Sequence, residues 1–164
     1  MSGQVLDFLS LSIVPFVGAG GVEIGDKKKE VLAKIGRPMY LRPGPRKPVY
    51  REGLCYKGMS ISLEDEKVYM ITAEEEYKGS TKEGLKVGVT WTALKEIYPS
   101  VTFHENKMVW YVPGIDGMSF RIVRPPRDDE IPVLFPYVDE EYEVVDKGRA
   151  FVYSISVHDL RYGA

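Results

Sequence analysis

The stretch "YKGMSISLEDEKVYMI" (residues 56–71) decides the fold, because apolar residues and serines alternate through "GMSISL". A period of two is typical of a strand that buries one of its faces. The same Gly-Met-Ser start and the same alternation return in "IDGMSFRIV" (residues 115–123), and "AFVYSISV" (residues 150–157) alternates as well. These stretches predict antiparallel strands, and their recurrence indicates one unit written twice.

A second pair of matching segments lies ahead of the strands. "GVEIGDKKKEVLAKIG" (residues 21–36) and "GLKVGVTWTALKEIYP" (residues 84–99) both read Gly, any two, Ile or Val, Gly, and then an amphipathic run. Apolar residues four apart fall on one helical face. Counted from the second glycine, these residues are Val31 and Ile35 in the first segment, and Leu94 and Tyr98 in the second.

Residues suited to helix ends flank both segments. Asp26 and Thr90 are expected N-caps, because their side-chain oxygens can accept from backbone N–H groups that lack an intrahelical partner. Gly36 suits a left-handed C-cap, and Pro99 cannot continue the second helix. We therefore expect one short helix in each segment.

The expected fold class is α+β: two tandem helix-plus-antiparallel-sheet repeats with adjoining sheets, the helices on one side. Residues 1–79 form the N-terminal unit and residues 80–164 form the C-terminal unit. A 124–148 insertion lengthens the second unit. Each unit is too small to bury its own sheet face, so the two together form one compact domain.

The opening "GGVEIGDKKKEVLAKIGRP" (residues 20–38) resembles the start of the SmpA/OmlA-like small lipoproteins of outer-membrane assembly. The tandem arrangement is similar to that of secreted β-lactamase inhibitor proteins. The chain also resembles small bacterial proteins from toxin–immunity operons that begin with the same glycine-rich, helix, Gly-x-Pro signature. The resemblance covers roughly residues 18–72 and 84–157. It implies a binding module without catalysis, and an immunity protein is its natural cytosolic form.

Charge and composition narrow the class of partner. A net charge of −2 predicts neither nucleic-acid binding nor attachment to a membrane. The lone Cys55 excludes an internal disulfide, and the apolar run near the N-terminus is interrupted by Pro15 and too short to span a bilayer. These features predict a cytoplasmic protein. Residues 27–57 are rich in Lys and Arg, whereas residues 125–146 are rich in acids.

No motif of metal or nucleophilic chemistry stands in the sequence. Cys55, His104 and His158 do not share a metal-ligand spacing. The glycines of "GAGG" (residues 18–21) lack the Lys-Ser/Thr ending of a phosphate loop and suit a tight turn instead. We therefore expect no catalytic residue, no metal and no cofactor.

The insertion is the predicted partner-binding site, because aromatic anchors inside a charged rim are typical of interfaces. We expect an immunity or inhibitor protein that neutralises a cognate protein toxin by covering the toxin's active site, with the acids steering association. Trp110 in its strand is an additional candidate contact. The insertion residues are Asp128, Asp129, Phe135, Tyr137, Asp139, Glu140, Glu141 and Tyr142.

Two other functions remain open at this point. A small-ligand binding protein would use a pocket between the units, lined by Tyr50, Tyr69, Tyr111 and Tyr153. A hydrolase would use Cys55 or a histidine such as His104. The sequence leaves the oligomeric state, the toxin and the geometry between the units unassigned.

Overall fold

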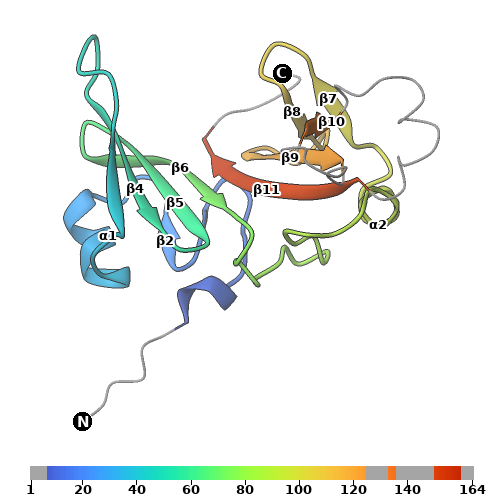
Figure 1. The fold of residues 1–164 in the computed structure, drawn as a ribbon, viewed down its shortest axis with the longest axis horizontal. Coiled ribbons are helices and arrows are strands. Elements are labelled where there is room, and N and C mark those ends of the chain that lie inside the picture. The colour runs from blue at the N-terminus through green and yellow to red at the C-terminus, as the bar shows by residue number, and fades with distance from the viewer. Residues whose placement is uncertain (1–6, 125–132, 136–149, 160–164) are drawn as a thin grey trace.

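Antiparallel strands dominate the fold in the computed structural model, which describes residues 7–124, 133–135 and 150–159. The elements are η1 (Phe8–Ser10), β1 (Gly18–Ala19), β2 (Val22–Glu23), α1 (Lys28–Ile35), β3 (Tyr40–Pro43), β4 (Arg51–Tyr56), β5 (Met59–Glu64), β6 (Lys67–Ala73), α2 (Trp91–Ile97), β7 (Thr102–His104), β8 (Val109–Tyr111), β9 (Met118–Arg124), β10 (Val133–Phe135) and β11 (Phe151–His158). Nine strands form one sheet in the order β3-β4-β5-β6-β11-β9-β8-β7, with β10 paired to β9 (Figure 1).

The register of the strands separates an apolar face from a polar face. Directly opposed residues of paired strands point to the same face of a sheet. One transverse line of opposed residues is entirely apolar, and every member from β4 to β9 is fully buried. It runs through Leu41, Leu54, Ile61, Ile71, Val157 and Met118. The alternation in residues 56–71 therefore places its apolar side chains on the core face, as predicted.

A layer of short elements covers the core face. Val31 of α1 and Leu94 of α2 are fully buried against the sheet, and Ile13 and Leu85 join them from connecting segments. One cluster of buried side chains runs through both halves of the chain. The helices span only eight and seven residues, so the N-terminal segment and the loop before α2 complete this layer.

The expected α+β fold of two helix-plus-sheet repeats with adjoining sheets is wrong. The chain is mostly antiparallel strand, and β6 pairs with β11 along Met70 to Ala73, which joins all the large strands into one sheet. Period-two patterns identify strands and their buried faces, but they carry no information about which strand edges meet. The backbone pairing of β6 with β11, which lie far apart in the sequence, therefore determines the architecture.

The local predictions hold at most of the helix and turn positions. The Thr90 hydroxyl caps α2 by accepting from the Ala93 N–H at 3.3 Å, and Gly36 ends α1 with a φ of 82°. Gly20 and Gly21 both have positive φ and form the two-residue turn between β1 and β2. Asp26 does not cap α1, because its carboxylate accepts from the Glu23 N–H and pairs with Lys34.

Tyr77 ties the N-terminal segment to the core. Its hydroxyl donates to the Leu11 carbonyl and accepts from the Gly20 N–H, each at 2.7 Å. Burial raises the pKa of Tyr77 to about 12, and the pKa values of Tyr56 and Tyr98 rise to about 12 for the same reason. In the unfolded chain these hydroxyls lose their protons near pH 10.

We expect stability to fall as the pH rises from about 10 to about 12. The native state keeps the three phenolic protons in that window while the unfolded state releases them, so alkali favours unfolding. Tyr77→Phe should cost about 1–3 kcal/mol at pH 7, because the Gly20 N–H and the Leu11 carbonyl lose their partner. The same variant should flatten the alkaline decline. Urea unfolding between pH 7 and 11.5 measures both effects, and an equally steep decline in Tyr77→Phe would contradict this account of Tyr77.

Candidate functional site

A second transverse line of opposed residues runs across the other face of the sheet. It passes from β3 to β9 and contains five hydroxyl side chains and one thiol. We refer to it as the polar row, and its members are Tyr40, Cys55, Ser60, Thr72, Ser156 and Ser119. Because serine and cysteine are small, the middle of this face carries little side-chain bulk.

Hydrogen bonds link neighbouring members of this face. The Thr72 and Ser156 hydroxyls lie 2.9 Å apart, where β6 meets β11. The Ser119 hydroxyl lies 3.0 Å from Nε2 of His158, and both of these side chains are buried. Which of the two atoms donates depends on the tautomer of the His158 ring.

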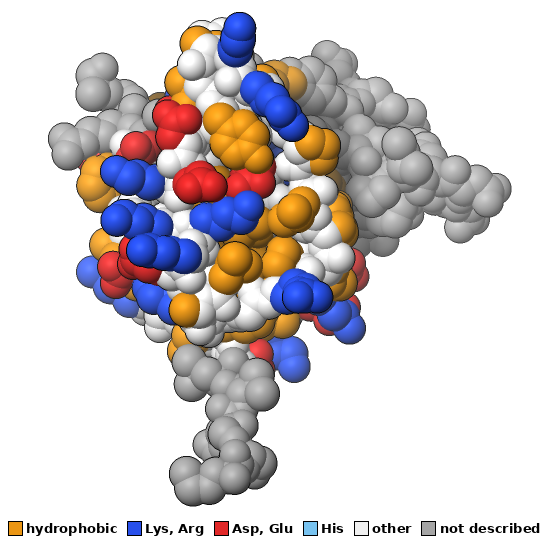
Figure 2. Space-filling model, turned by 90° about the vertical axis from the view of Figure 1, so that its left-hand side faces the viewer, with side chains coloured by type: hydrophobic (Ala, Val, Ile, Leu, Met, Phe, Trp, Pro, Cys, Tyr) orange, Lys and Arg blue, Asp and Glu red, His pale blue; other side chains and the backbone are white. Residues whose placement is uncertain are grey.

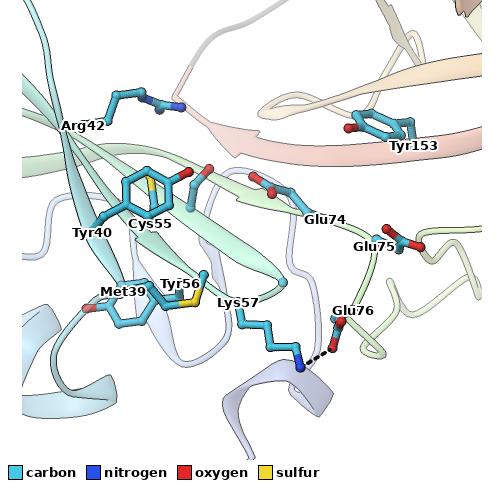
Figure 3. Close-up of a pocket in the computed structure, with 12 residues that line it drawn as sticks. Met39, Tyr40, Arg42, Cys55, Tyr56, Lys57, Glu74, Glu75, Glu76 and Tyr153 are labelled. Atoms are coloured by element: carbon cyan, nitrogen blue, oxygen red, sulfur yellow. Dashed lines mark ion pairs between the residues drawn. The ribbon is translucent and has the colours of Figure 1, made fainter. Parts of the chain in front are cut away.

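The β3 end of the polar row opens into a hollow of about 270 Å³ (Figure 3). We call it the Tyr40 hollow. Its floor is formed by Cys55 and Ser60, and its rim comes from four segments of the chain. The lining residues at the rim are Met39, Tyr40, Arg42, Lys57, Glu74, Glu75, Glu76 and Tyr153. Residues that are over a hundred positions apart in the sequence thus meet around one depression.

The rim combines exposed apolar side chains with both signs of charge. Met39 is 64% exposed, Tyr40 is 60% exposed and Tyr153 is 46% exposed, although large apolar side chains are usually buried. Arg42 lies over Gly53, whose missing side chain leaves room for the guanidinium. Lys57 forms an ion pair with Glu76 at 3.4 Å on the opposite side. The site offers aromatic contact and charged contact together.

The Tyr40 side chain lies next to the Cys55 thiol. This contact raises the pKa of the Tyr40 hydroxyl. The largest cause is the side-chain hydrogen bond with Cys55, and the next is the electrostatic interaction with the same residue. Cys55 itself is only 4% exposed at the floor of the hollow. Because Tyr40 lies opposite Cys55 in the paired strands, its ring is the exposed neighbour that can cover the free thiol.

We expect thiol reagents to label Cys55 slowly in the native protein, because a buried thiol is shielded from attack. Tyr40→Ala should raise the labelling rate at least about tenfold by uncovering the sulfur. Tyr50→Ala, an exposed tyrosine outside the hollow, is the matched control and should leave the rate unchanged. Absorbance-monitored labelling at neutral pH measures it. Equal rates for the two variants would show that Tyr40 does not shield Cys55.

Most of the insertion residues predicted to bind a partner lie outside the described residues. These are Asp128, Asp129, Tyr137, Asp139, Glu140, Glu141 and Tyr142. Phe135 is the last residue of β10, whose backbone pairs with β9. The insertion therefore stays a prediction.

Trp110 does not lie on an open surface. It is 9% exposed and packs edge-on against Trp91, with ring centroids 4.9 Å apart, and against Phe103. Its neighbour Tyr111 is half-buried and contacts the His104 ring. The structure thus places Trp110 in the core, so we leave it out of the candidate site.

The four tyrosines of the ligand-pocket alternative are not brought together. Tyr153 lines the Tyr40 hollow, whereas Tyr69 lines a different depression beside His158. Tyr50 donates to Glu52 on β4, and Tyr111 lies at the far end of the sheet. Among the described residues, no group of three or more His, Cys, Asp or Glu side chains is arranged to hold a metal ion.

Among the residues that line the Tyr40 hollow, sequence reasoning named Cys55 and Tyr153, each for another role, but it missed Met39, Tyr40 and Arg42. "RPMYLRP" (residues 37–43) carried the available signal, because prolines at both ends of a short run are typical of an edge strand. Glu74 to Glu76 follow the end of β6 and line the hollow. Their position depends on where β6 stops, which the sequence pattern did not define.

The chain matches no family model, no curated protein and no solved structure with which it was compared. Within the described residues, no helix is both long enough and apolar enough to cross a membrane. The candidate site therefore has to be interpreted from its own geometry.

Proposed function

We propose that this protein is a non-catalytic binding module that holds a protein partner on the polar face of its sheet, at the Tyr40 hollow. The observation that carries the proposal is the rim of exposed Met39, Tyr40 and Tyr153 around a floor of small side chains. Tyr, Met and Arg are the residue types enriched at the centres of protein interfaces.

The form of the hollow favours a protein over a small ligand. Small-molecule sites are usually enclosed, mostly apolar and about 300–1,000 Å³ in volume. The Tyr40 hollow is open, has about 270 Å³, and is ringed by charged side chains. Such a depression accepts one or two side chains of a larger partner whose remaining surface rests on the rim.

In the narrower form of this proposal, the partner is a cognate toxin and the protein is its immunity or inhibitor protein, acting in the cytoplasm. Support for this form comes from the resemblance of the glycine-helix-Gly-x-Pro segment to proteins of toxin–immunity operons. The mechanism would be steric: a toxin held on the rim cannot admit its own substrate.

The test is co-expression with the neighbouring reading frames, followed by capture on the tagged protein. A stoichiometric complex that protects the host from a toxic neighbour supports both forms of the proposal. A stoichiometric complex with a harmless protein supports the binding module and contradicts the toxin. If the protein forms no complex with any neighbouring gene product at micromolar concentration, the toxin form is contradicted. Capture of a partner from whole lysate then tests the general proposal of a binding module.

A further inference from the structure

β3 is an outer strand of the sheet. Among the described residues it pairs only with β4, so every second residue directs its N–H and C=O groups away from the sheet. Natural proteins usually protect such edges with charged residues, prolines or covering segments. Here Arg42 and Pro43 occupy one end of the four-residue strand, while Tyr40 stays 60% exposed and Leu41 stays 55% exposed. This edge is open to another strand.

Depressions flank β3 on both faces of the sheet. On the polar face lies the Tyr40 hollow, beside Tyr40 and Arg42. On the core face lies a mainly apolar groove of about 460 Å³ between α1 and the edge strand, lined chiefly by Leu32, Pro38, Leu41 and Leu54. We call it the Leu41 groove. Figure 2 looks onto this end of the molecule, where hydrophobic side chains gather among Lys and Arg, with Asp and Glu side chains beside them.

An added strand would use both depressions at once. Successive side chains of a strand point to opposite faces of its sheet. A segment paired with β3 would place every second side chain toward the Leu41 groove and the others toward Tyr40 and Arg42. The two depressions therefore select a segment that alternates between two kinds of residue.

The charge around β3 selects the chemistry of that segment. Residues 31–51 contain no Asp or Glu, and their cations are Lys34, Arg37, Arg42, Arg46, Lys47 and Arg51. Lys34 pairs with Asp26 and Arg51 pairs with Glu64. Within the described part of the chain, no ion pair involves Arg37 or Arg42. Glu74, Glu75 and Glu76 line the other side of the Tyr40 hollow, after β6, which is separated from β3 by β4 and β5. The charges of the β3 edge itself are therefore the cations. A second copy of this edge would bring like charges together, whereas an acidic segment would be attracted.

We propose that β3 binds an extended, acidic segment of the partner as an additional strand of the sheet. Its apolar residues enter the Leu41 groove and its carboxylates face Arg42. This inference rests on the proposed binding function and names the part of the partner that is recognised. Main-chain hydrogen bonds supply affinity in this mode, and alternate side chains supply specificity.

The test is an NMR titration of the ¹⁵N-labelled full chain with the capped peptide Ac-EVEVEVEV-NH2. We expect the amide signals of Tyr40, Leu41 and Arg42 to shift most. Two peptides are controls: Ac-KVKVKVKV-NH2 reverses the charge, and Ac-EEVVEEVV-NH2 keeps the composition but cannot present one apolar face as a strand. Each should bind at least about tenfold more weakly. Equal binding of all three, or no shift in β3, would overturn the proposal.

Matched charge reversals locate the contact. Arg42→Glu should weaken binding of the acidic peptide at least about tenfold, and Lys82→Glu, which changes the net charge equally on a side chain 90% exposed and outside this edge, should leave it unchanged. An equal loss of peptide binding in the two variants would show that only the overall charge matters, and it would overturn the edge site. If the peptide fails while a captured partner still depends on Tyr40 and Tyr153, the edge inference falls and the proposed function stands. If the peptide binds β3 while no captured partner depends on the hollow, the edge site stands and the proposed binding at the hollow is contradicted.

Discussion

Replacing Tyr40 and Tyr153 together by alanine is expected to weaken partner binding about 100- to 1,000-fold. Each ring is exposed at the rim of the Tyr40 hollow, and aromatic side chains at the centre of an interface typically contribute about 2 kcal/mol or more each. Two such losses correspond to nearly three powers of ten in affinity. Calorimetric titration with the captured partner measures the effect.

The same double variant should fold normally. Exposed substitutions usually change stability by about 0.5 kcal/mol or less, so the loss of binding would come from the interface itself. Tyr50→Ala is the matched control, because Tyr50 is an exposed tyrosine outside the hollow. Wild-type affinity for the partner in the double variant, or an equal loss of affinity in Tyr50→Ala, would show that the interface does not lie at the hollow.

Phe120→Ala is expected to destabilise the fold by about 3–5 kcal/mol, the usual range for truncating a buried phenylalanine. Phe120 is 1% exposed in β9, where it lies opposite Ile155 of β11 and Trp110 of β8. Its ring therefore supports the packing of β9 between β11 and β8. Urea unfolding followed by circular dichroism measures the loss.

Val17→Ala is the control for this core truncation. Val17 is an exposed apolar residue, and its substitution should change the free energy of unfolding by about 0.5 kcal/mol or less. A loss below about 1 kcal/mol in Phe120→Ala would show that the junction between β9 and β11 is not packed as described.

Local physics made much of the chain predictable. Alternation placed Met59, Ile61 and Leu63 in the core and the intervening serines on the opposite face. The capping role of Thr90 and the C-terminal end of α1 at Gly36 follow from side-chain and backbone preferences that act within four residues. Such features need no knowledge of the distant chain.

The sheet and the candidate site were not predictable in the same way. The pairing of β6 with β11 joins residues about 84 positions apart, as in the Thr72–Ser156 contact, and no period in the sequence specifies it. The Tyr40 hollow needs that pairing, because Tyr153 reaches it only from β11 while Tyr40 comes from β3. A site assembled from distant strands becomes visible only when the strand order is known.

Hydroxyl-radical footprinting of the protein alone and in complex with its captured partner tests the central claim most directly. Met39, Tyr40 and Tyr153 are reactive, exposed side chains at the rim of the hollow, and Val17 is an exposed reference outside it. The proposed interface predicts strong protection of the three rim residues and unchanged oxidation of Val17. Unchanged oxidation of Tyr40 and Tyr153 in a saturated complex would contradict it and place the partner elsewhere on the molecule.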